Sequence, residues 1–324
     1  MTRMTFWVVT AVTLVTSELG AQRDSWPKVQ FIQVEQGVKL EVLDWGGTGR
    51  PVVLLAGNTR TAHDFDEFAP ALTGSYHVYG VTRRGFGASS APADGYFADR
   101  LADDVLAVID TLGLVRPVLA GHSLAGEELS SIGARHPEKV AGLVYLDAAY
   151  GYAFYSPGNF ETDANELRRG LEQLHVAGAN GNVEEVRRLL SQLLTTDLPA
   201  LERSLRLVER DTPATSTTPP TRLMPPPAVG VSRLINEGTQ RYTEVHVPVL
   251  AIYQARGMPA TVAADSAAAA AWLAARVPAS RVIRTASPNV RVVILHDATH
   301  DVFRSNEADV LREMHVFIAT LPAP

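Results

Sequence analysis

The chain has 324 residues, of which 46% are hydrophobic and 20% charged, a composition typical of a globular protein. Its 29 basic and 35 acidic residues give a net charge of −6, and without a basic block the chain is not expected to bind nucleic acid. It has no cysteine, which excludes disulfides, thiolate metal sites and lipid attachment at a cysteine.

The N-terminal segment differs from the rest of the chain. Arg3 precedes an apolar run over residues 6–15, and small residues follow up to Ala21. This order predicts a secretory signal peptide over residues 1–21 and a periplasmic or secreted protein. The alternative is a short membrane anchor, but the run is too short to span a bilayer comfortably. We therefore expect no stable membrane insertion of the mature chain.

Strand patterns begin directly after this segment. Residues 29–34 and 38–45 predict two strands joined by a tight turn. Residues 51–56 form a continuous apolar run, which is typical of a strand buried on both faces. The patterns that follow predict a helical segment over residues 65–72, strands over 76–81, 118–120 and 140–146, and helices over 101–112 and 127–136. Strands that alternate with helices indicate a largely parallel sheet.

The alternation stops over residues 150–243. We expect a helical lid here, with helices over residues 161–174, 183–194 and 198–208. Six prolines between Asp211 and Gly230 predict an irregular connection. The pattern then resumes with strands over residues 247–253 and 290–295 and helices over 262–276 and 308–319. The predicted core therefore comprises residues 22–149 and 244–324.

The sequence Gly121-His-Ser-Leu-Ala125 contains the main candidate for a catalytic residue. It matches G-x-S-x-G with alanine in the last position, and it lies between a predicted strand and a predicted helix. A nucleophilic serine on a sharp strand-to-helix turn requires this context, and small neighbours avoid clashes there. The alternative is that Ser123 only caps the helix.

With the lid position and two further motifs, the chain resembles the α/β-hydrolase superfamily over residues 29–321. The motifs are Thr82-Arg-Arg-Gly-Phe-Gly-Ala-Ser89, with Thr82 in the usual Asp position, and the late Ala298-Thr-His-Asp-Val-Phe303. The resemblance implies a mostly parallel eight-stranded sheet flanked by helices, with a helical lid after strand 6. It implies architecture more strongly than substrate. The first motif is usually structural in the superfamily, so we expect tight backbone rather than chemistry from its glycines.

The resemblance favours His300 as the base, because it follows the last strand, after serine and acid in chain order. His296 is the fallback, and His122 is expected to have a packing role. The acid usually follows strand 7, where residues 254–261 contain no carboxylate. Asp147 at the end of strand 6 is the preferred candidate for the acid, and Asp265 is the alternative.

The oxyanion hole should use two backbone N–H groups, those of Asn58 and Leu124. A glycine turn and an asparagine cap are the alternative explanation for residues 57–58. Aromatic residues after Asp147 either line the pocket or pack the hinge of the lid; they are Tyr150, Tyr152, Phe154 and Tyr155.

These residues predict an exported serine hydrolase that cleaves carboxylic esters, possibly lactones, through an acyl-enzyme. Peptidase, C–C hydrolase and cofactor-free haloperoxidase activities are alternatives within the same superfamily. A non-catalytic binding protein is the alternative from another class, and only the missing acid after strand 7 favours it. The expected partner is a small-molecule ester or lactone. The histidine spacing suggests no metal, and no organic cofactor is expected.

Overall fold

The computed structural model of the protein describes residues 27–210, 212, 230–263, 265–277, 279–287 and 289–323. The predicted signal peptide, residues 1–21, and nearly all of the proline-rich connection lie outside the described residues. Among the helices within the described ranges, none is long and apolar enough to cross a bilayer.

The described residues form one eight-stranded sheet in the order β1-β2-β4-β3-β5-β6-β7-β8. The first two strands are antiparallel to their neighbours and the other six are parallel, which confirms the predicted fold class. The strands are β1 (Lys28–Glu35), β2 (Val38–Gly46), β3 (Pro51–Leu55), β4 (His77–Val81), β5 (Val118–His122), β6 (Gly142–Leu146), β7 (Val249–Gln254) and β8 (Val290–Leu295).

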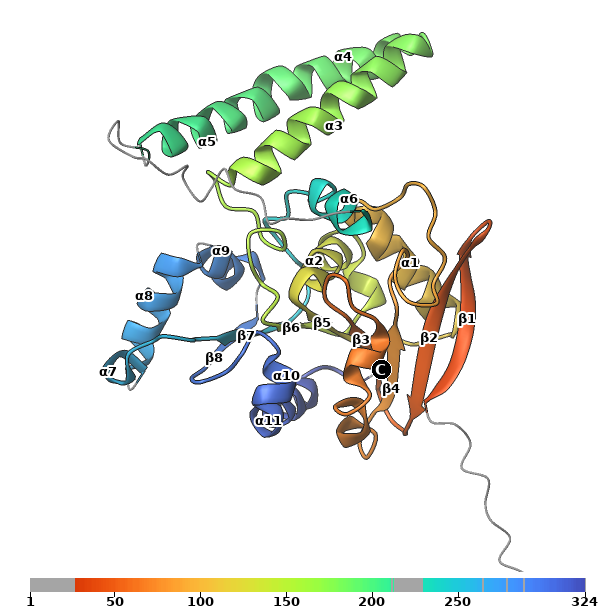
Figure 1. The fold of residues 1–324 in the computed structure, drawn as a ribbon, viewed down its shortest axis with the longest axis vertical. Coiled ribbons are helices and arrows are strands. Elements are labelled where there is room, and N and C mark those ends of the chain that lie inside the picture. Colours follow the sequence, from red (N-terminus) through yellow and green to blue (C-terminus); the bar gives the residue numbers. More distant parts are fainter. Residues whose placement is uncertain are drawn as a thin grey trace, which may run out of the picture.

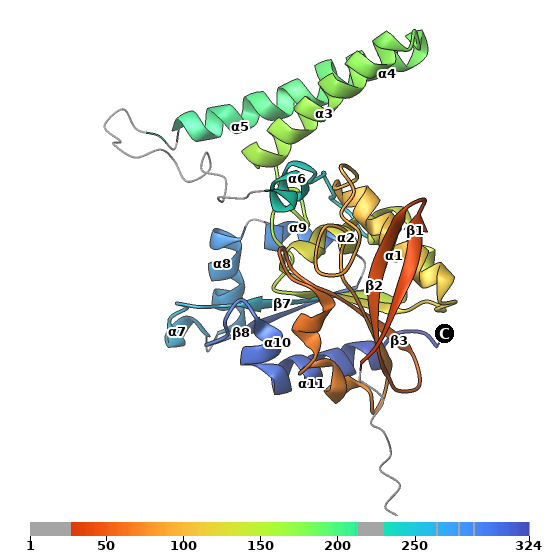
Figure 2. The same cartoon turned by 45° about the vertical axis from the view of Figure 1, so that its right-hand side comes forward.

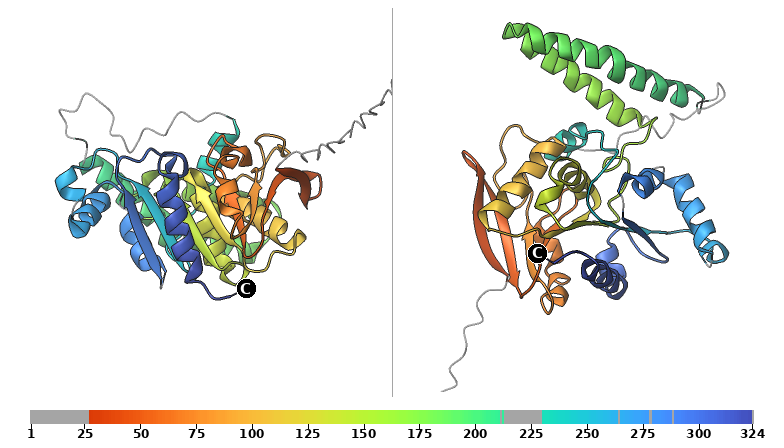
Figure 3. Two further views of the ribbon diagram at one scale, coloured as in Figure 1. Left: turned by 90° about the horizontal axis from the view of Figure 1, so that it is seen from below. Right: turned by 180° about the vertical axis from the view of Figure 1, so that it is seen from behind.

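Helices cover both faces of this sheet (Figures 1 and 3). One face packs against α1 (Ala98–Thr111), α2 (Gly126–Arg135), α8 (Ser266–Arg276) and α9 (Ala279–Ala286). The other packs against two 3₁₀ turns, Ala62–Phe65 and Ala69–Leu72, and against α10 (Val302–Ser305) and α11 (Glu307–Ala319).

Strand β3 illustrates the two cores. Val53 and Leu55 point into the first core and Val52 and Leu54 into the second. All four are at most 2% exposed, as the continuous apolar run predicts.

The chain between β6 and β7 carries the helical insertion. Its helices are α3 (Phe160–Ala179), α4 (Val183–Gln192), α5 (Leu198–Arg210) and α6 (Val231–Glu237), and a π-helical turn, Leu193–Asp197, joins α4 to α5. The long helices form an antiparallel hairpin that stands off the body of the protein (Figures 1 and 2). This is the insertion after strand 6 that the sequence predicts.

Buried charges connect this hairpin at its base. Arg241 donates to the Asp163 carboxylate from Nε (3.1 Å) and Nη2 (2.8 Å), and to Asp197 from Nη1 (2.7 Å). Tyr155 and Ser204 also donate to Asp163. Arg241 therefore links α3 to the π-helical turn.

Three local predictions were wrong. Residues 65–72 do not form one helix but belong to two 3₁₀ turns, because Pro70 lacks an N–H and falls at the start of the second. Residues 262–276 are divided into α7 (Ala260–Ala263) and α8, since Asp265 caps α8. The third is an omission: α6, α9 and α10 were not predicted, whereas the helix predicted over residues 308–319 corresponds to α11.

Candidate active site

Ser123 lies on the sharp turn between β5 and α2. A short 3₁₀ segment, Ser123–Ala125, joins the two elements, and Ser123 has a φ of +51°, in the left-handed region. A Cβ at Gly121 would lie 3.0 Å from both Ala125 Cβ and Leu129 Cδ1. The turn therefore leaves space only for small neighbours, and it holds the serine in strained backbone at the carboxyl edge of the sheet.

His300 contacts this serine from the loop between β8 and α10. Its Nε2 is 2.8 Å from Ser123 Oγ, within hydrogen-bond distance, and its side chain is 48% exposed. His122 Nε2 donates to the backbone carbonyl of His300 across 3.0 Å. The buried histidine beside the nucleophile thus holds the loop that carries His300.

His122 packs as the sequence analysis expects. Its ring lies against the rings of His300 and Phe303, with centroid distances of 4.7 and 5.2 Å. Burial, helped by the neighbouring His300, lowers the pKa of His122 to about 4. His122 therefore stays neutral near pH 7, and it adds no positive charge beside the serine.

Asp147 contacts the other nitrogen of His300. Its Oδ2 lies 2.7 Å from His300 Nδ1, and Asp147 is fully buried directly after β6. Its Oδ1 accepts two hydrogen bonds, from the Tyr150 hydroxyl (2.7 Å) and from the Gln254 N–H (3.0 Å). The φ of Asp147 is +47°, so its backbone is strained like that of Ser123. The carboxylate thus has three donors around it, and its orientation is fixed.

The alternative candidates are elsewhere. Asp265 is the N-cap of α8, and its Oδ1 accepts from the N–H groups of Ala267 (2.8 Å) and Ala268 (3.2 Å). It therefore lies at the start of α8, whereas the helix predicted over residues 262–276 would have placed it inside a helix. His296 is exposed in the turn after β8, and no hydrogen bond joins it to Ser123 within the described residues.

The two predicted oxyanion donors flank the serine. Leu124 follows Ser123 directly, and Asn58 lies in the loop after β3. A Cβ at Gly57 would lie 3.1 Å from Ser123 Cβ, so this loop runs against the nucleophile. Across the part of the chain that the structure describes, the Asn58 N–H donates to no protein acceptor. That N–H is therefore available to a ligand beside Ser123.

The aromatic residues after Asp147 divide between the site and the packing around it. Tyr150 contacts Asp147, and Tyr152 packs with the Leu124 cluster. Burial raises the pKa of the Tyr152 phenol well above its usual value; Asp147 adds to the rise and the Ser123 side chain opposes it. Phe154 is fully buried against Tyr145, and Tyr155 donates to Asp163 at the base of the helical hairpin.

The sequence analysis missed several contributors. The hydroxyl of Tyr150 and the backbone N–H of Gln254 carry no motif. Gly126 is a third, because a Cβ there would overlap the carbonyl oxygen of Ala148. Its position directly after Gly121-His-Ser-Leu-Ala125 was the available signal. Among the residues that the structure describes, no group of three His, Asp or Glu side chains could hold a metal ion.

A mostly parallel sheet with helices on both faces, a helical insertion after β6 and a serine on the turn after β5 define an α/β-hydrolase architecture. A family model described as the alpha/beta hydrolase fold matches residues 50–303. The chain belongs to the α/β-hydrolase fold family.

Individual relatives match a shorter segment. An AB hydrolase superfamily protein of Bacillus subtilis (strain 168) is 39% identical over 121 residues, 37% of this chain and 45% of that protein. A bifunctional esterase/perhydrolase of Acinetobacter calcoaceticus is 34% identical over 121 residues, 36% of this chain and 44% of that protein. The match therefore spans less than half the length of either relative.

A solved structure extends the likeness to most of the chain. The structure of an N-acyl homoserine lactone degrading enzyme aligns with a TM-score of 0.54 and 18% identity, covering 89% of this chain and 100% of that chain. At this identity the likeness shows the fold alone.

Proposed function

We propose that this protein is an exported serine hydrolase that cleaves carboxylic esters, lactones included, through an acyl-enzyme. The observation that carries the proposal is the continuous hydrogen-bonded chain from Ser123 through His300 to Asp147, with distances of 2.8 and 2.7 Å. A serine hydroxyl becomes a useful nucleophile only when an adjacent base accepts its proton, and this arrangement supplies such a base with a buried carboxylate behind it.

Each group has a defined role in the proposed reaction. Ser123 Oγ attacks the carbonyl carbon of the ester while His300 Nε2 accepts the proton. Asp147 holds the His300 tautomer that carries its proton on Nδ1 and stabilises the imidazolium. The N–H groups of Asn58 and Leu124 donate to the oxyanion. The alcohol leaves with the proton from His300, and water then attacks the acyl-enzyme by the same steps.

The position of Asp147 supports a catalytic function over the non-catalytic alternative. That alternative depended on the absence of a carboxylate after β7. Asp147 comes from β6 instead, and the β7 residue Gln254 donates its N–H to the same carboxylate. The esterase/perhydrolase named above supports ester substrates, and the lactone-degrading neighbour suggests that lactones be included in the assays.

A fluorophosphonate probe tests the nucleophile directly. We expect the wild-type protein to be labelled at Ser123 and to hydrolyse at least one of a series of p-nitrophenyl esters and lactones. The Ser123→Ala variant should lose labelling and lose at least about 10³-fold in kcat, because the remaining site has no nucleophile. Asp265→Asn, which changes the cap of α8, serves as a folded control and should still be labelled. An unlabelled wild-type protein, or equal labelling of Ser123→Ala, would overturn the proposal.

A further inference from the structure

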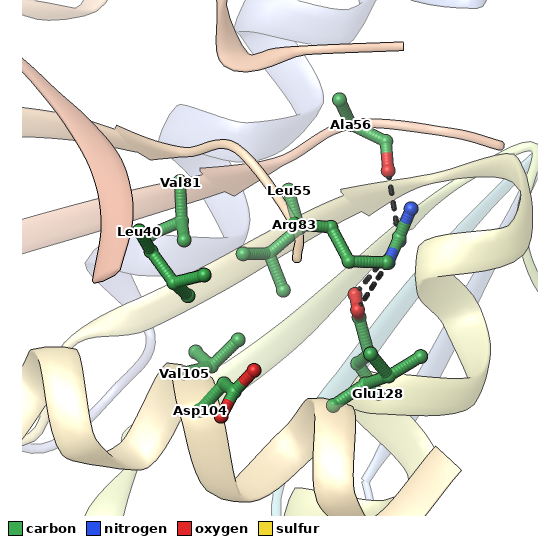
Figure 4. A pocket seen from close by; sticks show the side chains of 9 residues that line it. Leu40, Leu55, Ala56, Val81, Arg83, Asp104, Val105 and Glu128 are labelled. Carbon is green, nitrogen blue, oxygen red and sulfur yellow. Dashed lines mark hydrogen bonds and ion pairs between the residues drawn. The ribbon is translucent and has the colours of Figure 1, made fainter. Parts of the chain in front are cut away.

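Arg83 holds the loop that carries one of the proposed oxyanion donors. Its side chain is 5% exposed and comes from the turn after β4. Nη1 donates to the carbonyl of Gly57 (3.2 Å) and Nη2 to the carbonyl of Ala56 (3.0 Å). Figure 4 shows the guanidinium between Ala56 and Glu128. Two consecutive peptide carbonyls of this loop are thus bound by one cation.

Glu128 fixes that cation from the opposite side. Its carboxylate accepts from Arg83 Nε (2.5 Å) and Nη2 (3.0 Å), a bidentate arrangement, and its side chain is 3% exposed. Glu128 lies on α2, five positions after Ser123, so the ion pair connects the loop after β3 with the helix that begins at the nucleophile. The two proposed oxyanion donors, Asn58 and Leu124, belong to these two connected segments.

The contact between Arg83 and the Gly57 carbonyl also affects the direction of the Asn58 N–H, because of peptide geometry. In a trans peptide the C=O and N–H point in opposite directions, and the Gly57 carbonyl belongs to the same peptide as the Asn58 N–H. A cation on that carbonyl therefore turns the Asn58 N–H to the opposite side and makes it a stronger donor. Gly57 runs against Ser123, so this peptide is beside the reacting atoms.

We propose that Arg83, clamped by Glu128, is a positioning residue for the oxyanion hole: it sets the direction of the Asn58 N–H relative to Ser123. The inference rests on the proposed function, since it assigns a role within the same site. From the turn motif that contains Arg83, the sequence predicts only tight backbone.

Bulk solvent has little access to this ion pair. A cavity of about 10 Å³ beside it is lined by Arg83, Glu128 and Asp104 together with apolar side chains such as Leu55 and Val105. That volume holds about one water molecule. Bulk water therefore screens the ion pair and the hydrogen bonds from Arg83 to the loop little.

The neighbouring arginine provides a matched control. Arg84 is 1% exposed and is bound by Asp104 through Nε (2.6 Å) and Nη2 (2.7 Å). It is a buried bidentate pair in the same turn, but its hydrogen-bond partners are Asp104 and Glu35, not the loop after β3. Both pairs are buried and bidentate, and of the two only the Arg83 pair contacts the proposed oxyanion loop.

The experiment compares the double variants Arg83→Met/Glu128→Met and Arg84→Met/Asp104→Leu with the wild type. Double replacement avoids an unpaired buried charge, and such changes are often neutral for stability. We measure kcat and KM on a p-nitrophenyl ester, the rate of phosphonylation of Ser123 per labelled site, and Tm. For the Arg83 pair we expect kcat and phosphonylation to fall about 10- to 100-fold, below the loss for deleting an oxyanion donor, with KM within about 3-fold.

The Arg84 pair should retain wild-type rates per labelled site, whatever its Tm. A third variant, Arg83→Lys, keeps the charge beside Glu128 but loses the fork that spans both carbonyls, so we expect about a 10-fold loss of kcat. It keeps the test decisive if the Arg83 double variant does not fold. Wild-type rates in either Arg83 variant, or equal losses in the Arg84 control, would overturn the inference alone. An unlabelled, inactive wild-type protein would overturn the proposed function and this role with it.

Discussion

Asp147 shows how single hydrogen bonds decide what a carboxylate can do. One oxygen accepts from His300, and the other accepts from Tyr150 and from the backbone of Gln254. These contacts offer no acceptor for the NH2 of an amide, because the nitrogen of an asparagine would face either the His300 N–H or the other two donors. Replacement of Asp147 by asparagine therefore disturbs the tautomer of His300, and it also removes the negative charge at position 147.

We expect Asp147→Asn to lower kcat by about 10³- to 10⁴-fold, as for the acid of other serine–histidine–carboxylate sites. The matched control is Asp265→Asn, which changes a helix cap and should keep kcat within about 2-fold. Steady-state kinetics with circular dichroism of both variants checks this. The assignment is wrong if Asp147→Asn turns over like the wild type while Asp265→Asn does not.

The sequence was most informative where a residue belongs to a local motif. Ser123 and His300 are recognisable because each lies in a short pattern beside a strand. Gln254, a partner of Asp147, is not recognisable in this way, since it is 107 residues away and donates through its backbone. That contact exists only because β6 and β7 are neighbours in the sheet. Arg83 was undervalued for the same reason: its partners lie 26, 27 and 45 residues distant.

At the scale of elements, the base of the helical hairpin depends on one cation. Arg241 pairs with Asp163 and Asp197, whose side chains are 0% and 1% exposed. We expect Arg241→Met to lower the free energy of unfolding by about 3–5 kcal/mol, because it leaves buried carboxylates without their cation. Denaturant unfolding measures the loss, and hydrogen exchange should place it in α3 and α5 rather than in β5.

The control for this change is Arg188→Met on the same hairpin. Arg188 pairs with Glu185 at the surface, where the side chains are 55% and 37% exposed. Such exposed pairs contribute little to the free energy of unfolding, so we expect Arg188→Met to leave it nearly unchanged. Similar losses in the two variants, or faster exchange in β5 for Arg241→Met, would contradict the view that Arg241 holds the hairpin.

Helices with a clear apolar period were predicted well, and short elements were not. The helices expected over residues 161–174, 183–194 and 198–208 correspond to α3, α4 and α5, with α3 continuing to Ala179. The π-helical turn between α4 and α5 has no sequence signature. The helix α6 has seven residues, and its ends are set by tertiary contacts such as those of Gly238 with residues 96–97, which local pattern does not encode.

For the whole molecule, the alternation of strands and helices was enough to predict the sheet, because parallel connections allow few topologies. The strand order, with β4 between β2 and β3, was not predicted from the sequence, whereas both cores fill with the apolar runs that the sequence shows.

We propose that residues 1–21 direct export and are removed after Ala21. In a bacterial host with a periplasm, the full chain should reach the periplasm and begin at Gln22 by N-terminal sequencing. A variant that begins at Gln22 after an initiator Met should stay in the cytoplasm. Because the chain has no cysteine, folding requires no oxidising compartment, and both forms should have the same kcat and a Tm within about 2 °C. If the full chain remains in the cytoplasm with residues 1–21 intact, the predicted signal peptide is refuted. Intact chain in the membrane fraction would instead favour an anchor.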